Sequence, residues 1–347
     1  MKKALFAGSI VVLAGIVLLA MFSVGGTALA AEKVYTWKCP AHWPMASSSY
    51  KDSLQVVAER VKERTNGRLI IEPYPAAALF PGKENFNAVK RGMVPMAVTS
   101  AAYDLAQVPL LNVNSGLPLN FSEVWEAVYF YKWLGFEQMV KDEFAKHGLM
   151  YFTDKLYPTE LSVKKPVRTF EDFKGLKIRS SGVLQKYLTS IGAAASYIPG
   201  GEVYTALASG VIDGAHWGAV QGSLSMKFYE ISKYHLRPAL NIAATDYWVI
   251  NKKEFEKLPK DLQEILVKTL EEEFWLRTNQ YLYQENISLT KIQKELGVEL
   301  ITLPPADFAK MQVAAMKLWG EIAQTSPECA KAVEMLTDFN RQMGRIK

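Results

Sequence analysis

The stretch between Lys174 and Gly218 constrains the fold more than any other part of this 347-residue sequence. Short extended segments alternate there with short amphipathic ones, which predicts three strands and two helices. The strands are expected at Leu176–Arg179, Ala193–Ile198 and Val211–Trp217, and the helices at Val183–Ile191 and Glu202–Ser209. Such alternation favours a parallel sheet with right-handed crossovers. The fold class predicted from this stretch is therefore α/β.

Two side chains in this stretch stand where a ligand of an α/β sheet is expected. Arg179 ends one predicted strand and Trp217 ends another, and ligands of such sheets bind outside the carboxyl ends of the strands. An arginine beside a tryptophan suits a small carboxylate with some apolar body, although a core position for Trp217 stays open. His216 precedes Trp217, so strand alternation should point its ring the other way, into a structural or surface position.

Four elements of the same stretch resemble one known family. They are the Leu-Lys-Ile-Arg run that ends at Arg179, Gly192-Ala193, the run Glu202–Leu207 and the run Gly210–Gly214. Together they resemble the signature of DctP-type solute-binding proteins of TRAP (tripartite ATP-independent periplasmic) transporters. The resemblance implies a two-lobed periplasmic-binding-protein (Venus flytrap) architecture with a long helix spanning both lobes. In that family the arginine that closes this strand binds the carboxylate of the ligand, and Arg179 occupies its position.

The N-terminal residues 1–31 have the pattern of a secretory signal. Lys2 and Lys3 precede an apolar run from Ala4 to Phe22, and Ala28-Leu29-Ala30 matches an A-x-A cleavage site. We therefore expect a periplasmic protein cleaved near Ala30; an uncleaved membrane anchor is the alternative. The formal net charge is +5, and two of these charges belong to the leader, so nucleic acid is not a predicted partner.

The mature chain is expected to form two lobes, and the chain is expected to cross between them more than once. Residues 32–155 with about 238–265 are predicted to form lobe I, and residues 156–237 with about 266–347 lobe II. Separate strands are expected at Gly148–Thr153, Leu161–Lys164, His235–Pro238 and Ala243–Asn251. Lys260–Leu296 contains no glycine or proline and predicts one helix of roughly 50 Å, long enough to reach both lobes.

Further residues are candidates for the ligand site. Tyr103 follows a predicted strand and could line a cleft, although ordinary packing is an equal alternative. Many relatives have a second arginine about twenty residues before the strand-end arginine, and here Tyr157-Pro158-Thr159 stand in its place. Its absence argues against sialic acid and dicarboxylates. Tyr157 and Thr159, which stand in its place, are predicted to contact the ligand. A tryptophan at position 217 resembles the branch of the family that binds 2-oxo and related monocarboxylic acids.

Asp246 and Tyr247 interrupt an otherwise apolar strand. Asp246 could accept a hydroxyl of the ligand or hold a cation that bridges to it, since some relatives in the oxo-acid branch use a bound cation. The match is out of register, and a satisfied surface aspartate is an equal alternative. No cofactor and no metal site are therefore predicted.

The sequence lacks the common catalytic motifs. It contains no G-x-S-x-G, H-E-x-x-H, C-x-x-C or phosphate-binding glycine pattern. Cys39 and Cys329 are predicted to be unpaired. The predicted function is an extracytoplasmic solute-binding subunit, not an enzyme, with a small organic acid and TRAP permease subunits as partners. An exported enzyme acting on such an acid, or a binding protein that feeds a sensor kinase, remains an alternative.

Overall fold

The computed structural model describes residues 32–346, so the predicted leader lies outside the described residues. From Val34 onward the chain forms one compact unit. Among its described helices, none combines the length and the apolar character needed to cross a membrane.

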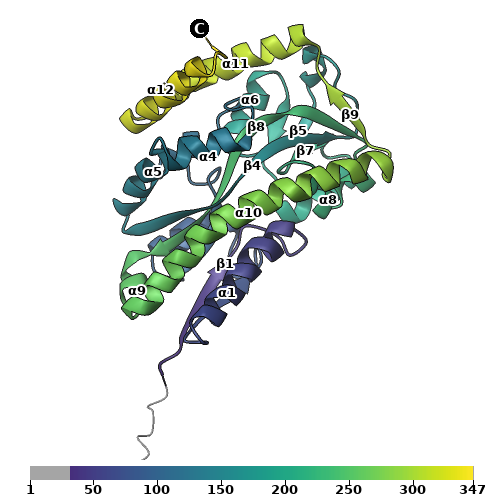
Figure 1. Cartoon of the computed structure of the whole chain (residues 1–347). Helices are drawn as coiled ribbons and strands as arrows, with labels where there is room; N and C mark the ends of the chain where they lie inside the picture. Colours follow the sequence, from purple (N-terminus) through teal and green to yellow (C-terminus); the bar gives the residue numbers. More distant parts are fainter. Residues whose placement is uncertain (1–31, 347) are drawn as a thin grey trace, which may run out of the picture. The chain divides into compact units, whose positions relative to one another are not determined.

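Two long antiparallel strands, β4 (Leu149–Val163) and β8 (Tyr234–Asn251), form the centre of the main sheet (Figure 1). The strand order is β3-β8-β4-β7-β5-β6, with β9 (Glu299–Thr302) also beside β8. One end of β8 pairs with β3 (Met96–Ser100), whereas the far end of β4 pairs with β7 (Gly214–His216). The same two strands therefore belong to both halves of the molecule.

The prediction that each of these strands is two separate ones was wrong. Proline and polar residues near the middle suggested breaks, but β4 continues through them with register shifts around Asp154, Pro158 and Glu160. A β-bulge tolerates a residue that cannot donate to the ladder, such as Pro158. Glu160 is buried because it finds a partner inside, with its Oε2 2.6 Å from Nε2 of His235.

The β/α alternation of the opening stretch is confirmed. β5 (Lys177–Arg179) is parallel to both β6 (Ala194–Ser196) and β7. The connections contain α6 (Gly182–Ser190) and α7 (Val203–Ser209). Strands β5 and β7 therefore end at the same edge of the sheet, which brings Arg179 close to the segment that follows His216.

A second, two-stranded sheet lies at the N-terminal end of the described chain. β1 (Tyr35–Pro40) pairs in parallel with β2 (Leu69–Tyr74). A π-helical segment, Tyr50–Gln55, continues into α1 (Val56–Arg64) between them. Ala41, just after β1, bridges to Val98 of β3. The loop that follows β1 is thereby held against the main sheet.

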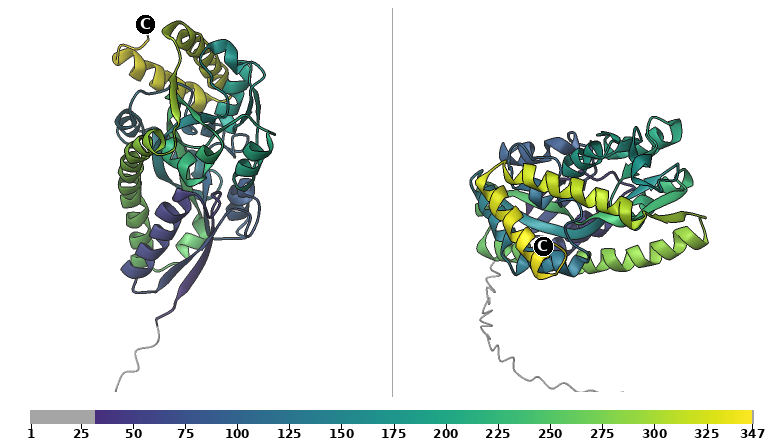
Figure 2. Two further views of the ribbon diagram at one scale, coloured as in Figure 1. Left: turned by 90° about the vertical axis from the view of Figure 1, so that its right-hand side faces the viewer. Right: turned by 90° about the horizontal axis from the view of Figure 1, so that it is seen from above.

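Helix α10 (Lys260–Lys294) is the long helix that the sequence predicts (Figures 1 and 2). Its first half buries Leu262, Leu266 and Leu270 in a cluster with α1 and β3 residues. Its second half reaches α8 (Val220–Ser225), where Glu285 accepts hydrogen bonds from the backbone amides of Val220 and Gln221 at 3.0 and 2.8 Å. The helix thus packs on both halves of the fold. The lobe boundaries given above stay a prediction.

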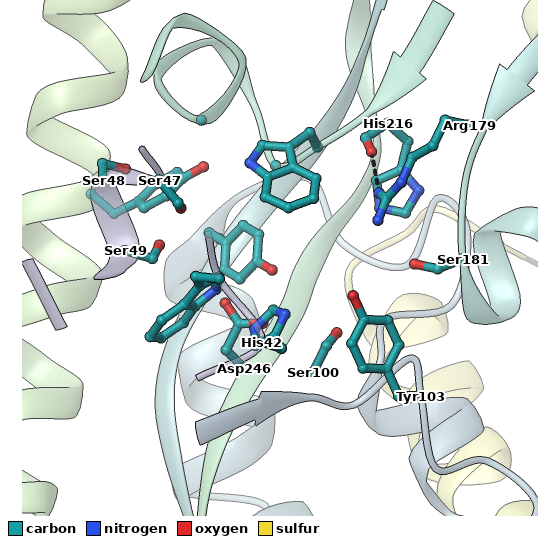
Figure 3. A pocket seen from close by; sticks show the side chains of 16 residues that line it. His42, Ser47, Ser48, Ser49, Ser100, Tyr103, Arg179, Ser181, His216 and Asp246 are labelled. Carbon is teal, nitrogen blue, oxygen red and sulfur yellow. Dashed lines mark hydrogen bonds and ion pairs between the residues drawn. The ribbon is translucent and has the colours of Figure 1, made fainter. Parts of the chain in front are cut away.

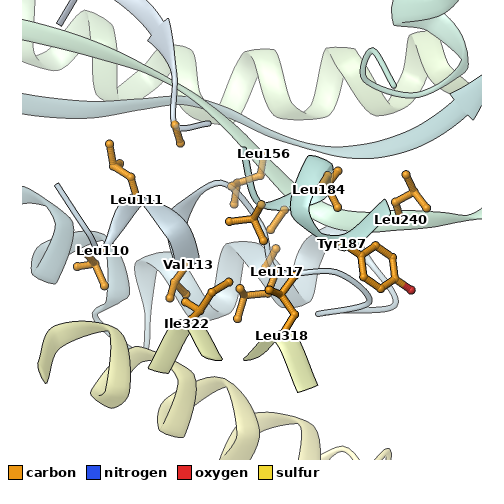
Figure 4. Close-up of a cluster of buried hydrophobic side chains, with 14 of the residues drawn as sticks. Leu110, Leu111, Val113, Leu117, Leu156, Leu184, Tyr187, Leu240, Leu318 and Ile322 are labelled. Atoms are coloured by element: carbon orange, nitrogen blue, oxygen red, sulfur yellow. The ribbon is translucent and has the colours of Figure 1, made fainter. Parts of the chain in front are cut away.

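The largest hydrophobic cluster joins the C-terminal helices to the rest. Leu318 and Ile322 of α11 (Pro305–Ala323) pack with Leu110, Val113 and Leu117 (Figure 4). α12 (Pro327–Gln342) contributes Cys329, which is free and lies in a different cluster from the free Cys39. The other helices are α2 (Asn85–Lys90), α3 (Leu111–Asn114), α4 (Val124–Lys132), α5 (Phe136–Ala145) and α9 (Lys252–Glu256). Short helical turns lie at Gly82–Glu84, Phe170–Phe173, Gly200–Glu202 and Phe228–Glu230.

Candidate functional site

A small pocket lies where the loop after β1 faces the strand ends of β5 and β7 (Figure 3). Sixteen described residues line it, and they come from segments far apart in the chain. They are His42, Trp43, Ser47, Ser48, Ser49, Ser100, Tyr103, Tyr157, Arg179, Ser181, His216, Trp217, Gly218, Gly222, Asp246 and Tyr281. The space for the centres of water molecules is about 60 Å³, or roughly four to six water positions. The pocket is therefore sized for a molecule of few atoms.

Arg179 is fixed in the pocket wall by backbone carbonyls. Its Nε donates to the Ile198 carbonyl at 3.0 Å and its Nη1 to the His216 carbonyl at 2.7 Å. The residue is only 3 % exposed, yet no salt bridge of the described residues involves it. A buried guanidinium with neutral partners keeps its full positive charge and spare donors for an anion.

Trp217 lies beside this guanidinium. The Arg179 guanidinium carbon lies 4.9 Å from the centre of the indole ring, and the ring meets Phe228 edge to face at 6.4 Å. Gly200 approaches the ring so closely that a Cβ there would lie 2.3 Å from a Trp217 ring carbon. Trp217 therefore has a fixed orientation and offers a flat apolar wall next to the positive charge.

The expectation that His216 points away from Trp217 was wrong, because both side chains line the pocket. Strand β7 ends at His216 and the backbone turns at Gly218, whose φ is +60°, so alternation no longer separates the two side chains. His216 Nδ1 lies 2.8 Å from the Ser180 hydroxyl. Burial, followed by the nearby Arg179, lowers the pKa of His216 to about 3, so the imidazole adds no charge at neutral pH.

A buried group of ionic residues forms another wall of the pocket. Nζ of Lys155 lies 2.7 Å from Oδ2 of Asp246 and 2.9 Å from Oδ2 of Asp154. The second oxygen of Asp246, Oδ1, lies 3.1 Å from Nε2 of His42. Burial favours the neutral acid, but Lys155 and then His42 bring the pKa of Asp246 below its ordinary value. Asp246 is therefore a carboxylate held between an ammonium and an imidazole.

His42 connects this group to the pocket. Its Nε2 points toward Asp246, while its Nδ1 is a buried atom without a hydrogen-bond partner among the described residues. Figure 3 shows His42 and Asp246 together on one side of the pocket and Arg179 on another. The pocket therefore has a second polar side chain, His42, on a side different from that of Arg179.

The structure brings together five of the seven site residues predicted from the sequence, namely Tyr103, Tyr157, Arg179, Trp217 and Asp246. Thr159 lines a smaller adjoining cavity, where its buried hydroxyl has no partner among the described residues. Tyr247 lies away from both cavities. Its hydroxyl donates to Asp104 at 3.4 Å and its ring packs on Phe144 and Tyr151.

Several lining residues were not predicted from the sequence. His42, Trp43 and the serines 47–49 follow β1, and Tyr281 comes from α10. Nothing local in the sequence showed that this loop would reach the strand ends of β5 and β7. Lys155 was missed because the β-bulge at Thr153–Lys155 turns two consecutive side chains, Asp154 and Lys155, toward each other.

Comparison with known proteins identifies the family. Residues 41–326 match the model of the bacterial extracellular solute-binding protein family 7, DctP. The chain belongs to this family. A monocarboxylate 2-oxoacid-binding periplasmic protein of Nostoc sp. is 25 % identical over 88 % of this chain and 84 % of its own length.

Two solved TRAP periplasmic solute-binding proteins share the fold with a TM-score of 0.82 each. The protein from Pseudoalteromonas atlantica, bound to sodium and pyruvate, is 25 % identical. The protein from Colwellia psychrerythraea, bound to calcium and pyruvate, is 26 % identical. Both matches cover 90 % of this chain and 95 % of the other. The two-lobed α/β architecture of this family 7 protein is thus established.

Contacts across the pocket join the two sides of this family 7 protein. The Ser48 hydroxyl donates to Oε1 of Gln221 at 2.9 Å, and the Ser48 amide donates to the Ser225 hydroxyl at 3.3 Å. At another edge Nζ of Lys83 lies 3.4 Å from the centre of the Tyr197 ring. These contacts link segments assigned by prediction to different lobes, so the described conformation has the lobes close together.

Gly182 provides a test of this closure. A Cβ at Gly182 would lie 2.6 Å from Cβ and 2.9 Å from Cα of Ala102, so Gly182→Ala should hold the two sides apart. We expect weaker ligand binding and a larger radius of gyration with ligand, measured by calorimetry and solution scattering. The control is Gly175→Ala, since Gly175 also has positive φ but no atom within 4 Å of the added carbon. Equal affinity in the two variants would contradict the expectation.

Proposed function

We propose that this protein captures a small monocarboxylic acid with a 2-oxo or 2-hydroxy group in the periplasm and delivers it to TRAP permease subunits. One observation carries the proposal: the Arg179 guanidinium is buried at the pocket wall without a carboxylate partner among the described salt bridges, beside the Trp217 ring. A guanidinium presents a rigid fork to a carboxylate, and such bonds strengthen when closure excludes water.

The family supports the class of function. The matched family model describes extracellular solute-binding proteins, and the relatives named above bind a 2-oxoacid or pyruvate. The tripartite organisation of TRAP transporters supports delivery to a permease, and the predicted leader, with its cleavage motif near Ala30, supports export. Ligand binding alone explains the residues of the pocket, and no chemical reaction is needed to explain them. We therefore propose no enzymatic activity.

The pocket favours one carboxylate over two. Arg179 is the one arginine or lysine among the described residues that line it, whereas a dicarboxylate calls for a second cationic contact. The rest of the lining instead offers polar groups without a fixed positive charge: the hydroxyls of Ser100, Tyr103 and Ser181, and the imidazole of His42. Such groups suit a keto or hydroxyl oxygen next to the carboxylate. The small volume supports a ligand smaller than sugar acids such as sialic acid.

The ligand class is tested with a thermal-shift panel followed by calorimetry. Pyruvate, lactate and compact aryl acids should raise the melting temperature, because a ligand that binds only the folded state stabilises it. Succinate and sialic acid should leave it unchanged. Mass spectrometry of acids that co-purify provides an independent identification, and incubation of those acids with the protein should show no turnover. A dicarboxylate as the best ligand would refute the proposal.

A further inference from the structure

We propose that Lys155 is the resident cation of this pocket, so that ligand binding requires neither sodium nor calcium. The inference rests on the proposed function for the identity of the ligand, but its geometry is independent of it. Two relatives hold sodium or calcium together with pyruvate. In this chain an ammonium group that cannot dissociate already neutralises the carboxylate of the pocket wall.

Lys155 is held on all sides by its surroundings. The residue is fully buried, and its Nζ contacts Asp154 and Asp246 at hydrogen-bonding distance. The same atom lies 4.5 Å from the centre of the Trp43 ring and 4.9 Å from that of Tyr157. Trp43, Tyr157 and Asp246 all line the pocket, so the positive charge lies directly behind its wall.

Three of the four carboxylate oxygens around Lys155 have a polar partner, and Oδ1 of Asp154 is buried without a hydrogen-bond partner among the described residues. Asp246 faces Lys155 with one oxygen and His42 with the other. Asp154 accepts a hydrogen bond from Ser53 as well as from Lys155, and Ser53 in turn accepts one from Arg277 of α10. This chain of contacts anchors the ammonium to α10 and keeps it from leaving Asp246.

The residues present do not fit a bound metal ion. No group of three or more His, Cys, Asp or Glu side chains in residues 32–346 is arranged to hold one. A cation on Asp246 would also lie a few ångströms from the Lys155 ammonium, and two like charges at such a distance in a buried site repel strongly. The Lys155 ammonium therefore supplies the positive charge that a bound metal ion would supply. Its repulsion also prevents a metal ion from binding beside it.

The direct test titrates the intact protein with calcium chloride or sodium chloride alone. We expect no binding heat, no change in tryptophan fluorescence, and no rise in melting temperature beyond that of choline chloride at equal ionic strength. The affinity for pyruvate, or for the best acid of the panel, should agree within about twofold between chelator-treated choline buffer and buffers with either ion. An affinity that collapses without the ions and returns with them would overturn the inference.

The variant Lys155→Gln supplies the converse test. It leaves Asp154 and Asp246 without their shared ammonium, and calcium prefers such carboxylate oxygens. We expect calcium to raise the melting temperature of this variant. Without calcium, the variant should bind the acid at least about tenfold more weakly than the parent protein does. Lys164→Gln is the matched control, because Lys164 follows β4 directly, is not among the residues that line the pocket, and donates from Nζ to the Leu207 carbonyl. A Lys155→Gln variant that binds the acid like the parent without calcium would contradict the inference.

The two proposals fail in different ways. If no acid of the panel binds in any buffer, the proposed ligand class is wrong, whereas the titration with metal ions alone still decides the role of Lys155. If Lys155→Gln does not fold, the experiments on the unmodified protein remain decisive, since they need no substitution.

Discussion

Replacement of Arg179 by alanine is expected to weaken binding of the best acid by about thirtyfold or more, because truncating one partner of a buried charged pair costs roughly 2–5 kcal/mol. The loss should be this large since Arg179 is buried and is the one fixed positive charge among the described lining residues. Calorimetry with the acid selected by the ligand panel measures the change, and unchanged affinity would refute the role of Arg179.

Two further variants separate charge from geometry and from stability. Arg179→Lys keeps the charge but cannot reproduce the fork that also holds the Ile198 and His216 carbonyls, so it should lose affinity as well. Arg168→Ala is the control, because Arg168 is exposed and pairs with Glu299 at the surface; its affinity should match the parent. Melting curves without ligand show whether Arg179→Ala still folds.

Proline at Thr269 is expected to destabilise the protein by about 3 kcal/mol or more and to uncouple the two lobes, since proline breaks a helix interior. Thr269 lies in the first half of α10, and it is buried. Its hydroxyl donates to the Ile265 carbonyl at 2.7 Å and accepts from Nη1 of Arg64 at 3.1 Å. Chemical denaturation measures the stability, and solution scattering with and without ligand measures closure.

The control for this prediction is Thr269→Ala, which removes the contact with Arg64 but leaves the helical ladder intact. It should lose far less stability than the proline variant and should still become more compact with ligand. Hydrogen exchange should show protection near Arg179 and Trp217 on ligand binding, with smaller changes in the middle of α10. If the proline variant binds and closes like the parent, α10 is a packing element and not a spine.

The site was predictable where a side chain's position follows from a strand end. Arg179 and Trp217 follow short parallel strands whose ends meet at one edge of the sheet, so their proximity is a consequence of the β/α alternation. Asp246 and Tyr247 show the limit of such reasoning. They are neighbours in β8, and strand alternation directs Asp246 to the pocket and Tyr247 to the opposite face. The sequence did not show which of the two faces borders the pocket.

Local sequence determined the elements whose patterns are continuous. The glycine- and proline-free run from Lys260 predicted α10 to within two residues of its C-terminal end, and the alternation after Lys174 predicted β5, α6 and α7. Each depends on contacts between residues near in the chain, so composition and spacing are sufficient.

Only the tertiary structure decided what surrounds the ligand site. Pro158 and the charged residues Asp154, Lys155 and Glu160 suggested the end of a strand, yet β4 passes through them because bulges absorb the register shifts and each charge finds a buried partner. The partner of Glu160, His235, lies 75 residues away along the chain, and the partner of Lys155, Asp246, lies 91 residues away. A buried charge is stable only when its partner is in place, and long-range pairing of this kind leaves no local pattern in the sequence.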